Sequence, residues 1–354
     1  MLLGTVSKSN PFLPPYLTFC EESTLEKVEG RYHRQEILEG WDQGKIQQST
    51  VLIAGVGALG SMVAVFLSLM GIGKLILIDM DTIELSNLNR QLLFTEKDIG
   101  EFKARIAAQK LREINPNIHI VDLSKNLTEV PRKYFEESDV IVDGLDTFEA
   151  RRWLNSLCVG LKKPLVHGGM YGWYGNVQVI IPYRTPCLEC QPLLPRERFQ
   201  KSCTPPGRKR ENVEPPKFPG VSTISAVLSG IQAQETIKVL LDLPTLIDNY
   251  LFYDGLSQSF TTIKLERNPK CIICSDEYRL EGIEYAIDKK ETIRELKNRL
   301  TATLGLVAPI RVIHKTRFVE DDTKIEDMDL ASGDLLFVYD KSLGKPLKLR
   351  AKIS

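Results

Sequence analysis

Cysteine spacing is the first feature of this sequence that points to chemistry. Two pairs, Cys187-x-x-Cys190 and Cys271-x-x-Cys274, have the separation at which a tight turn directs two sulfurs towards one metal ion. Together they predict a tetrahedral four-cysteine zinc site, which is structural because no coordination position stays open. The alternative is two redox-active or incidental pairs. The long gap between the pairs favours a clip that joins distant segments.

A fifth cysteine, Cys203, follows the first pair in the stretch "PCLECQPLLPRERFQKSC". The segment 191–220 is rich in proline, lysine and arginine, which predicts a mobile loop rather than a core element. Cations such as Lys201 and Arg208 favour the thiolate, the nucleophilic form of a cysteine. Cys203 is therefore either a nucleophile on a loop or an inert exposed thiol.

A glycine turn is the second feature that points to chemistry. The stretch "VLIAGVGALG" is a short apolar run that ends in Gly55-x-Gly57-x-x-Gly60, and an apolar pattern at helical spacing follows it. The next apolar run, "KLILID", ends in Asp79. Strand, glycine turn, helix, strand and acid are the context in which this motif holds a nucleotide phosphate at a helix N-terminus.

Four further segments closely resemble one family. They are "RYHRQ" (31–35), "GIGKLILIDMDTIELSNLNRQLLF" (71–94), "GEFKA" (100–104) and "DGLDT" (143–147). With the glycine turn they are similar, in the same order, to the adenylating domain of ubiquitin-activating enzymes and of the bacterial adenylyltransferases of molybdopterin and thiamine biosynthesis. The resemblance runs from about residue 29 to residue 275.

The resemblance implies an ATP site with magnesium. Its residues are Gly55, Gly57, Gly60, Asp79, Asp81, Asn87, Arg90, Gln91, Lys103 and Asp146. It implies that Asp79 binds the ribose hydroxyls, that Arg90 and Lys103 offset charge on the leaving pyrophosphate, and that Asp146 is the magnesium-linked carboxylate. Asp81 is either a helix cap or a ligand. Arg34 matches an arginine that reaches the γ-phosphate from the partner subunit, which implies a homodimer.

The same resemblance gives Cys203 a role, because a cysteine after the first zinc pair takes the activated modifier as a thioester in the activating enzymes. The implied function is ATP-dependent activation of a ubiquitin-like modifier that ends in Gly-Gly, with transfer from Cys203 to a conjugating enzyme. The first alternative is a sulfur-carrier adenylyltransferase without an obligatory enzyme thioester. The second is a non-catalytic scaffold that binds a β-grasp partner.

These residues require a particular set of elements around them. Apolar runs at 138–146, 164–169 and 176–182 predict further strands, and 222–241 predicts a helix. The fold class is α/β, with a Rossmann-like, mostly parallel sheet and helices on both faces. After the last cysteine pair, "EGIEYAI", a helix capped by Thr292 and Glu295, "PIRVIH" and "DLLFVYD" predict a small α+β domain.

Three segments divide the chain. We expect an extension at 1–28, an adenylation domain at 29–279, and a ubiquitin-fold (β-grasp) domain at 280–354. The sequence ends in "LKLRAKIS". That ending lacks the Gly-Gly of a modifier, so the last segment is expected to recruit a conjugating enzyme rather than to serve as substrate.

Composition excludes several classes. The 354 residues contain 46 Lys and Arg against 46 Asp and Glu, so net charge gives no case for nucleic acid or an anionic membrane. No signal-like or membrane-spanning stretch is evident, and seven cysteines do not suit a secreted disulfide framework. We expect a soluble cytoplasmic protein in which Cys158 is a core residue, His167 is a strand-end residue and Cys20 has no assigned role.

Overall fold

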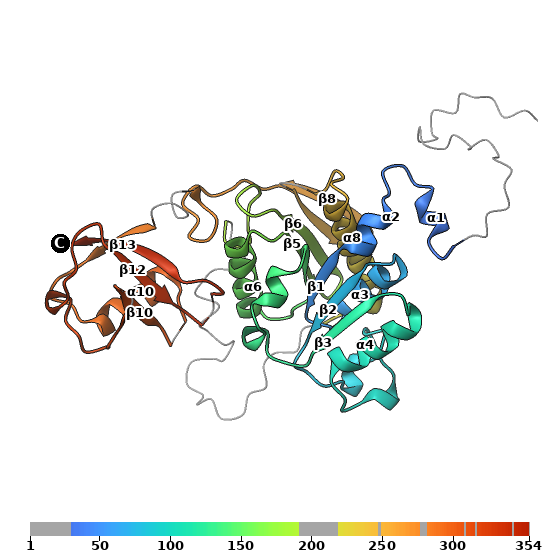
Figure 1. Cartoon of the computed structure of the whole chain (residues 1–354), viewed down its shortest axis with the longest axis horizontal. Helices are drawn as coiled ribbons and strands as arrows, with labels where there is room; N and C mark the ends of the chain where they lie inside the picture. The colour runs from blue at the N-terminus through green and yellow to red at the C-terminus, as the bar shows by residue number, and fades with distance from the viewer. Residues whose placement is uncertain are drawn as a thin grey trace, which may run out of the picture.

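The computed structural model describes residues 30–190, 219–246, 249–276, 282–307, 309–315, 317–341 and 343–353. These residues form a large sheet of eight strands and a separate sheet of five strands (Figure 1). The large sheet consists of β1 (Thr50–Ala54), β2 (Lys74–Ile78), β3 (His119–Leu123), β4 (Val140–Asp143), β5 (Leu165–Tyr171), β6 (Tyr174–Ile180), β7 (Asn249–Asp254) and β8 (Ser259–Lys264).

The large sheet has the order β3-β2-β1-β4-β5-β6-β7-β8. The first five strands in this order pair in parallel, as predicted, and β6, β7 and β8 extend the sheet with antiparallel pairs. The predicted strands at 138–146, 164–169 and 176–182 are confirmed as β4, β5 and β6. Strands β3, β7 and β8 were not predicted.

Helices cover both faces of the parallel part of the sheet, as predicted (Figure 1). Helices α3 (Gly60–Leu69), α4 (Lys103–Ile114) and α8 (Ser222–Leu240) pack on one face, and α6 (Phe148–Leu161) packs on the other. Alternate residues of β1 enter the two cores: Val51 and Ile53 on the α3 side, Leu52 and Ala54 on the α6 side. Burial on both faces explains why parallel strands read as continuous apolar runs.

Short helices connect the larger elements of the chain, both around the eight-stranded sheet and in the C-terminal unit. They are α1 (His33–Glu36), α2 (Gln43–Gln48), α5 (Lys133–Glu136) and the 3-10 turns η1 (Leu85–Asn87), η2 (Glu96–Asp98), η3 (Leu127–Glu129) and η4 (Ile325–Asp327). Cys158 on α6 is fully buried, so its predicted core position is confirmed. Among the described helices, none has the length and apolar character that a membrane span requires.

The C-terminal unit is an α+β arrangement, as predicted. It contains β9 (Ile283–Ile287), α10 (Ile293–Leu304), β10 (Arg311–His314), β11 (Arg317–Val319), β12 (Leu335–Tyr339) and β13 (Leu347–Ile353). The predicted capping box is present, because Glu295 N–H donates to Thr292 Oγ1 (3.3 Å) and Thr292 N–H donates to the Glu295 carboxylate (2.7 Å). Strands β11 and β13 were not predicted, and β13 lies between β12 and β9 inside the sheet.

Candidate nucleotide site and four-cysteine centre

The nucleotide motif lies where the strand order of the large sheet reverses. From β1 the chain crosses to β2 on one side, whereas β4 pairs with β1 on the other side. The loops that leave β1 and β4 therefore lead to helices on opposite faces of the sheet, α3 and α6. Open α/β sheets bind ligands at the carboxyl ends of the strands at such a point, and this region is called the crevice below.

Glycines let these two loops touch. Gly55 has a φ of +86°, and a Cβ atom built there would lie 2.7 Å from the carbonyl oxygen of Gly144, which follows β4. A Cβ atom on Gly60 would lie 1.9 Å from the carbonyl oxygen of Gly55. The turn can therefore be this tight only without side chains at these positions, and it brings the N-terminus of α3 next to the loop of Asp146.

Asp79 follows β2 and lies beside the glycine turn, as the motif predicts. Its carboxylate accepts hydrogen bonds from the backbone N–H groups of Val56 (2.7 Å) and Asp81 (2.9 Å). Burial raises the pKa of Asp79, and the nearby Lys103 ammonium acts against this shift. The arrangement positions a carboxylate next to the glycine turn.

Lys103, the first residue of α4, is buried and pairs with Asp81 at 2.9 Å. Asp81 is therefore an ion-pair partner of Lys103 in this structure rather than a helix cap. The pair lies next to Asp79, so one cation and two carboxylates meet within the β2–α4 region. The ion pair holds the ammonium in place.

The segment after β2 supplies amide and guanidinium groups. Asn87 is buried, and its side-chain oxygen accepts the N–H of Glu84 (3.1 Å). Gln91 is buried close to Gly57, and its side-chain oxygen has no hydrogen-bond partner among the described residues. Arg90 Nη1 donates to the carbonyl oxygen of Ser86 (2.8 Å). Of these three residues, Gln91 is the one that the structure brings next to the glycine turn.

Asp146 is exposed in the loop between β4 and α6, and Thr147 caps that helix. A buried network holds the loop. The Asp143 carboxylate accepts the N–H of Leu145 (3.0 Å) and the Nδ1–H of His167 (2.6 Å). Gln232 of α8 donates to the carbonyl oxygen of Asp143 (3.0 Å).

His167 therefore has a structural partner, as expected. It is the third residue of β5, however, and not the strand-end residue that was predicted. Arg151 adds to the network, because its guanidinium donates to the carbonyl oxygen of Leu145. Sequence reasoning missed the supporting roles of Asp143, Arg151 and Gln232. Asp143, the first residue of "DGLDT", could have indicated this network, because a carboxyl group at the end of a buried strand requires hydrogen-bond partners.

Two predicted site residues are not brought to the crevice by the described structure. Arg34 lies exposed on α1. Cys203 and the segment 191–218 lie outside the described residues, as do the extension at 1–28 and Cys20.

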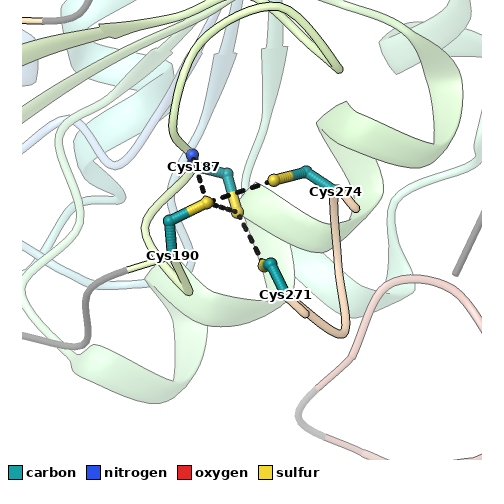
Figure 2. A group of neighbouring side chains, drawn as sticks. All are labelled: Cys187, Cys190, Cys271 and Cys274. Carbon is teal, nitrogen blue, oxygen red and sulfur yellow. Dashed lines mark hydrogen bonds between the residues drawn. The ribbon is translucent and has the colours of Figure 1, made fainter. Parts of the chain in front are cut away.

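The four cysteines of the predicted metal site come together and are buried (Figure 2). Their sulfurs all lie within 4.8 Å of one another. The Cys187–Cys271 sulfur distance is 3.7 Å, and the Cys190 sulfur lies 4.0 Å from that of Cys187 and 3.2 Å from that of Cys274. Four sulfurs around one tetrahedral zinc ion are about 3.8 Å apart, so the cluster has the dimensions of such a site.

Donors around the sulfurs also suit a thiolate centre. The N–H groups of Cys187 and Ile273 point at the sulfurs of Cys190 (3.4 Å) and Cys271 (3.4 Å). Hydrogen bonds from the neighbouring thiols lower the pKa of Cys190, whereas burial raises the pKa of Cys187. Four buried thiols this close together cannot all lose their protons without a cation nearby. A divalent cation would stabilise all four as thiolates.

Comparisons with known proteins agree with this architecture. A sulfur carrier protein adenylyltransferase of Thermus thermophilus is 36% identical over 72% of this chain and 93% of the relative. The SAMP-activating enzyme E1 of Haloferax volcanii is 35% identical over 70% of this chain and 88% of the relative. The crystal structure of E. coli MccB with ATP is similar with a TM-score of 0.56 and 25% identity, over 66% of this chain and 68% of that one.

The ThiF family model matches residues 32–273, which include the glycine turn, the Asp146 loop and three of the four clustered cysteines. Together with the two relatives, this match shows that the chain belongs to the ThiF family.

Proposed function

We propose that this protein is an adenylyltransferase that uses ATP to activate the carboxyl-terminal glycine of a small ubiquitin-like carrier protein. The observation that carries the proposal is the contact between the glycine turn and the loop of Asp146, with Asp79 and Lys103 beside it. The names of the two relatives, a sulfur carrier adenylyltransferase and a SAMP-activating enzyme, support the same reaction class.

In this reaction a carrier carboxylate attacks the α-phosphate of ATP, and the bond to pyrophosphate breaks. The attacking group is already ionised at neutral pH, so no general base is required. Gly55, Gly57 and Gly60 allow the triphosphate to approach the backbone at the start of α3, and Asp79 accepts the ribose hydroxyls. Asn87, Arg90, Gln91 and Lys103 hold the phosphates and offset charge on the leaving pyrophosphate.

Asp146 is the proposed ligand for magnesium, since an exposed carboxylate beside the phosphate turn suits a hard cation. When bound, magnesium neutralises charge on the phosphates. Asp81 either serves as a second ligand or continues to hold Lys103. The buried Asp143–His167 pair keeps the Asp146 loop in place for this role.

An aromatic surface next to the crevice is the proposed docking site for the carrier. Asp143 at the end of β4 pairs with His167, so the rest of β5 extends past the carboxyl end of β4. The hairpin that follows exposes Tyr171 (59%), Trp173 (47%) and Tyr174 (38%). Such a cluster of large aromatic side chains is typical of protein interfaces.

We also propose a homodimer in which Arg34 reaches the phosphates of the partner's site. Arg34 is exposed on α1, and the segment that follows α1 lines an apolar groove of about 580 Å³ together with α3 and α8. Trp41, Phe66 and Ile237 are among its lining residues. A second copy that covers this groove would bury apolar surface and bring Arg34 close to another chain.

The four-cysteine centre is the proposed structural zinc site. It does not contact the crevice through any described hydrogen bond, and all four thiols are needed to complete the tetrahedron. Its expected contribution is therefore to stability rather than to adenylation.

Exchange of labelled pyrophosphate into ATP tests the adenylation proposal. Exchange should require both the protein and a carrier with a free Gly-Gly terminus, here a bacterial sulfur carrier protein, and a carrier that lacks the last glycine should not support it. Binding of the carrier without exchange would instead support the scaffold alternative.

A second candidate function adds a thioester on Cys203 and transfer to a conjugating enzyme. Two observations favour testing it: the similarity to an enzyme named as an E1, and the C-terminal unit, proposed as a ubiquitin-fold domain at 280–354 after the adenylation domain at 29–279. On the sheet face opposite α10, Phe318 (61%) and Tyr339 (43%) are exposed, and Arg311 packs on the Phe318 ring. Such a surface suits a protein partner.

The residues Leu347–Ile353 form a central strand and so cannot act as the flexible tail of a carrier. A non-reducing gel after incubation with ATP and carrier decides the question. A thiol-sensitive adduct that is lost in Cys203→Ala supports the thioester, and its absence in wild type with normal pyrophosphate exchange supports the sulfur-carrier type.

A further inference from the structure

The C-terminal unit packs against α6 through the segment Leu343–Pro346. The backbone N–H of Gly344 donates to Ser156 Oγ (2.6 Å). A Cβ atom on Gly344 would lie 2.6 Å from Leu157 Cβ, and one on Gly160 would lie 3.3 Å from the side chain of Lys345. Backbone and helix therefore approach as closely as glycine allows, so this contact is specific in shape.

Lys345 links this segment to the second cysteine turn. Its Nζ donates to the carbonyl oxygen of Ile273 (2.7 Å), which lies between Cys271 and Cys274. The ammonium also lies close enough to Cys187, Cys271 and Cys274 to interact with charge on their sulfurs. Four thiolates around a divalent ion carry two net negative charges, so a cation at this position stabilises the occupied centre.

Arg152 of α6 links the first cysteine turn to the other contact of the C-terminal unit. Its guanidinium pairs at 3.0 Å with Glu189, which lies between Cys187 and Cys190. It also donates to the carbonyl oxygens of Gly305 (2.8 Å) and Leu304 (3.4 Å), at the end of α10. A cation at the carboxyl end of a helix satisfies unpaired carbonyl groups and interacts favourably with the helix dipole.

We propose that the four-cysteine centre and α6 together form a docking surface for the C-terminal unit, and that zinc in the centre holds this surface in its binding geometry. Each cysteine turn has one cation that connects it to the C-terminal unit: Arg152 for the first turn and Lys345 for the second. Loss of zinc would release both turns and so detach the unit. The proposal depends on the zinc assignment and not on the adenylation reaction.

This arrangement has two consequences. The attachment of the C-terminal unit to α6 depends on zinc, and the exposed sheet face that carries Phe318 and Tyr339 has a fixed position relative to α6 while zinc is bound. Helix α6 begins directly after Asp146, so the docked unit contacts the same helix that borders the nucleotide crevice.

Hydrogen exchange on the full chain tests the docking. Zinc removal with a chelator should increase exchange at 304–307 and 343–346 at least several-fold, while β10 and β12 inside the C-terminal unit stay protected. Unchanged exchange at both segments after complete zinc removal would overturn the proposal. A chain purified without chelator that contains no zinc would overturn it together with the zinc assignment.

Variants that retain zinc separate docking from general unfolding. Lys345→Met should release zinc to a colorimetric chelator several-fold faster than wild type and increase exchange at 304–307 and 343–346, and Lys345→Arg should recover most of the wild-type behaviour. Lys341→Met is the matched control, because Lys341 is exposed on the same connection before β13. Equal zinc release and equal exchange in Lys345→Met and wild type would contradict the proposal, whatever the effect of the chelator.

Discussion

The nucleotide crevice and the four-cysteine centre are assembled in different ways. Most of the crevice comes from one continuous stretch, from Gly55 to Lys103, in which a strand, a turn and a helix place the residues by local geometry. The cysteine centre joins two turns that are far apart in the chain, and its surroundings come from α6 and the C-terminal unit. A site built from one continuous stretch can therefore be predicted from the sequence together with its surrounding residues. For a site that joins distant segments, the sequence predicts the metal ligands but not the residues around them.

This comparison predicts that changes at the crevice affect adenylation, whereas changes at the cysteine centre affect stability and the attachment of the C-terminal unit. The two regions should separate experimentally.

The largest expected effect is on catalysis at the crevice. Asp146→Ala should lower carrier-dependent pyrophosphate exchange by roughly 100-fold or more, since stabilisation of charge on transferring phosphates supplies several kcal/mol. Glu149→Ala is the control, because Glu149 is exposed in the first turn of the same helix and should leave exchange unchanged. Normal exchange in Asp146→Ala would remove this carboxylate from the site.

A second large effect is expected from one methyl group in the turn. In Gly60→Ala the new Cβ would meet the carbonyl oxygen of Gly55 at 1.9 Å, so the backbone must shift. We expect the free energy of unfolding to fall by about 1–3 kcal/mol and ATP affinity to fall strongly.

The matched change is Gly230→Ala in α8, where a Cβ atom would meet nothing within 4 Å. Alanine favours a helix interior over glycine by about 0.5–1 kcal/mol, so this variant should be at least as stable as wild type. Denaturant unfolding and ATP titration measure both variants, and equal behaviour of the two would contradict the account of the turn.

A smaller effect on adenylation is expected at the cysteine centre. Cys271→Ser should lose bound zinc and lower the melting temperature by several degrees, because the metal contributes to folding free energy. ATP binding should persist, since the described crevice residues are elsewhere in the sheet. Cys158→Ala, which removes a buried sulfur outside the cluster, should keep its zinc in metal analysis. Loss of ATP binding in Cys271→Ser would show that the two regions are not separable.

The last expected effect is modest and concerns both stability and ATP binding, at His167. His167→Ala removes one donor from the buried Asp143 carboxylate but leaves the N–H of Leu145 in place. We expect a loss of stability of about 1–3 kcal/mol and only a several-fold rise in the KM for ATP. In His167→Asn a side-chain amide can still donate, so most of the stability should return. Identical unfolding curves for wild type and His167→Ala would exclude the proposed support of the loop.

Sequence alone predicted β1, β2, β4 and β5 of the parallel part of the sheet, because strands buried on both faces are continuous apolar runs and the glycine turn marks where β1 ends. It did not predict β3, in which one residue is buried, nor β7 and β8. The residues of β8 are all exposed, so no apolar alternation marks it as an edge strand. Strand β11 has only three residues. Strand β13 alternates apolar and charged residues, which is the pattern of a half-buried strand, so the signal was present but was not used.

The candidate site likewise has a part that the sequence predicted and a part that it did not. The positions of Asp79, Lys103 and the cysteine pairs relative to their neighbours follow from motif and strand order. The partnership of Asp143 with His167, and those of Arg152 and Lys345 with the cysteine turns, depend on tertiary contacts between distant segments. No periodicity or spacing in a single sequence encodes such contacts.

The most direct test of the central proposal is the intact mass of the carrier after incubation with the protein, ATP and magnesium. The account predicts that the sulfur carrier protein gains the mass of AMP with wild type and with Cys203→Ala, and gains nothing with Asp146→Ala. A carrier that keeps its original mass with wild type, although ATP and carrier both bind, would contradict the assignment of this protein as an adenylyltransferase.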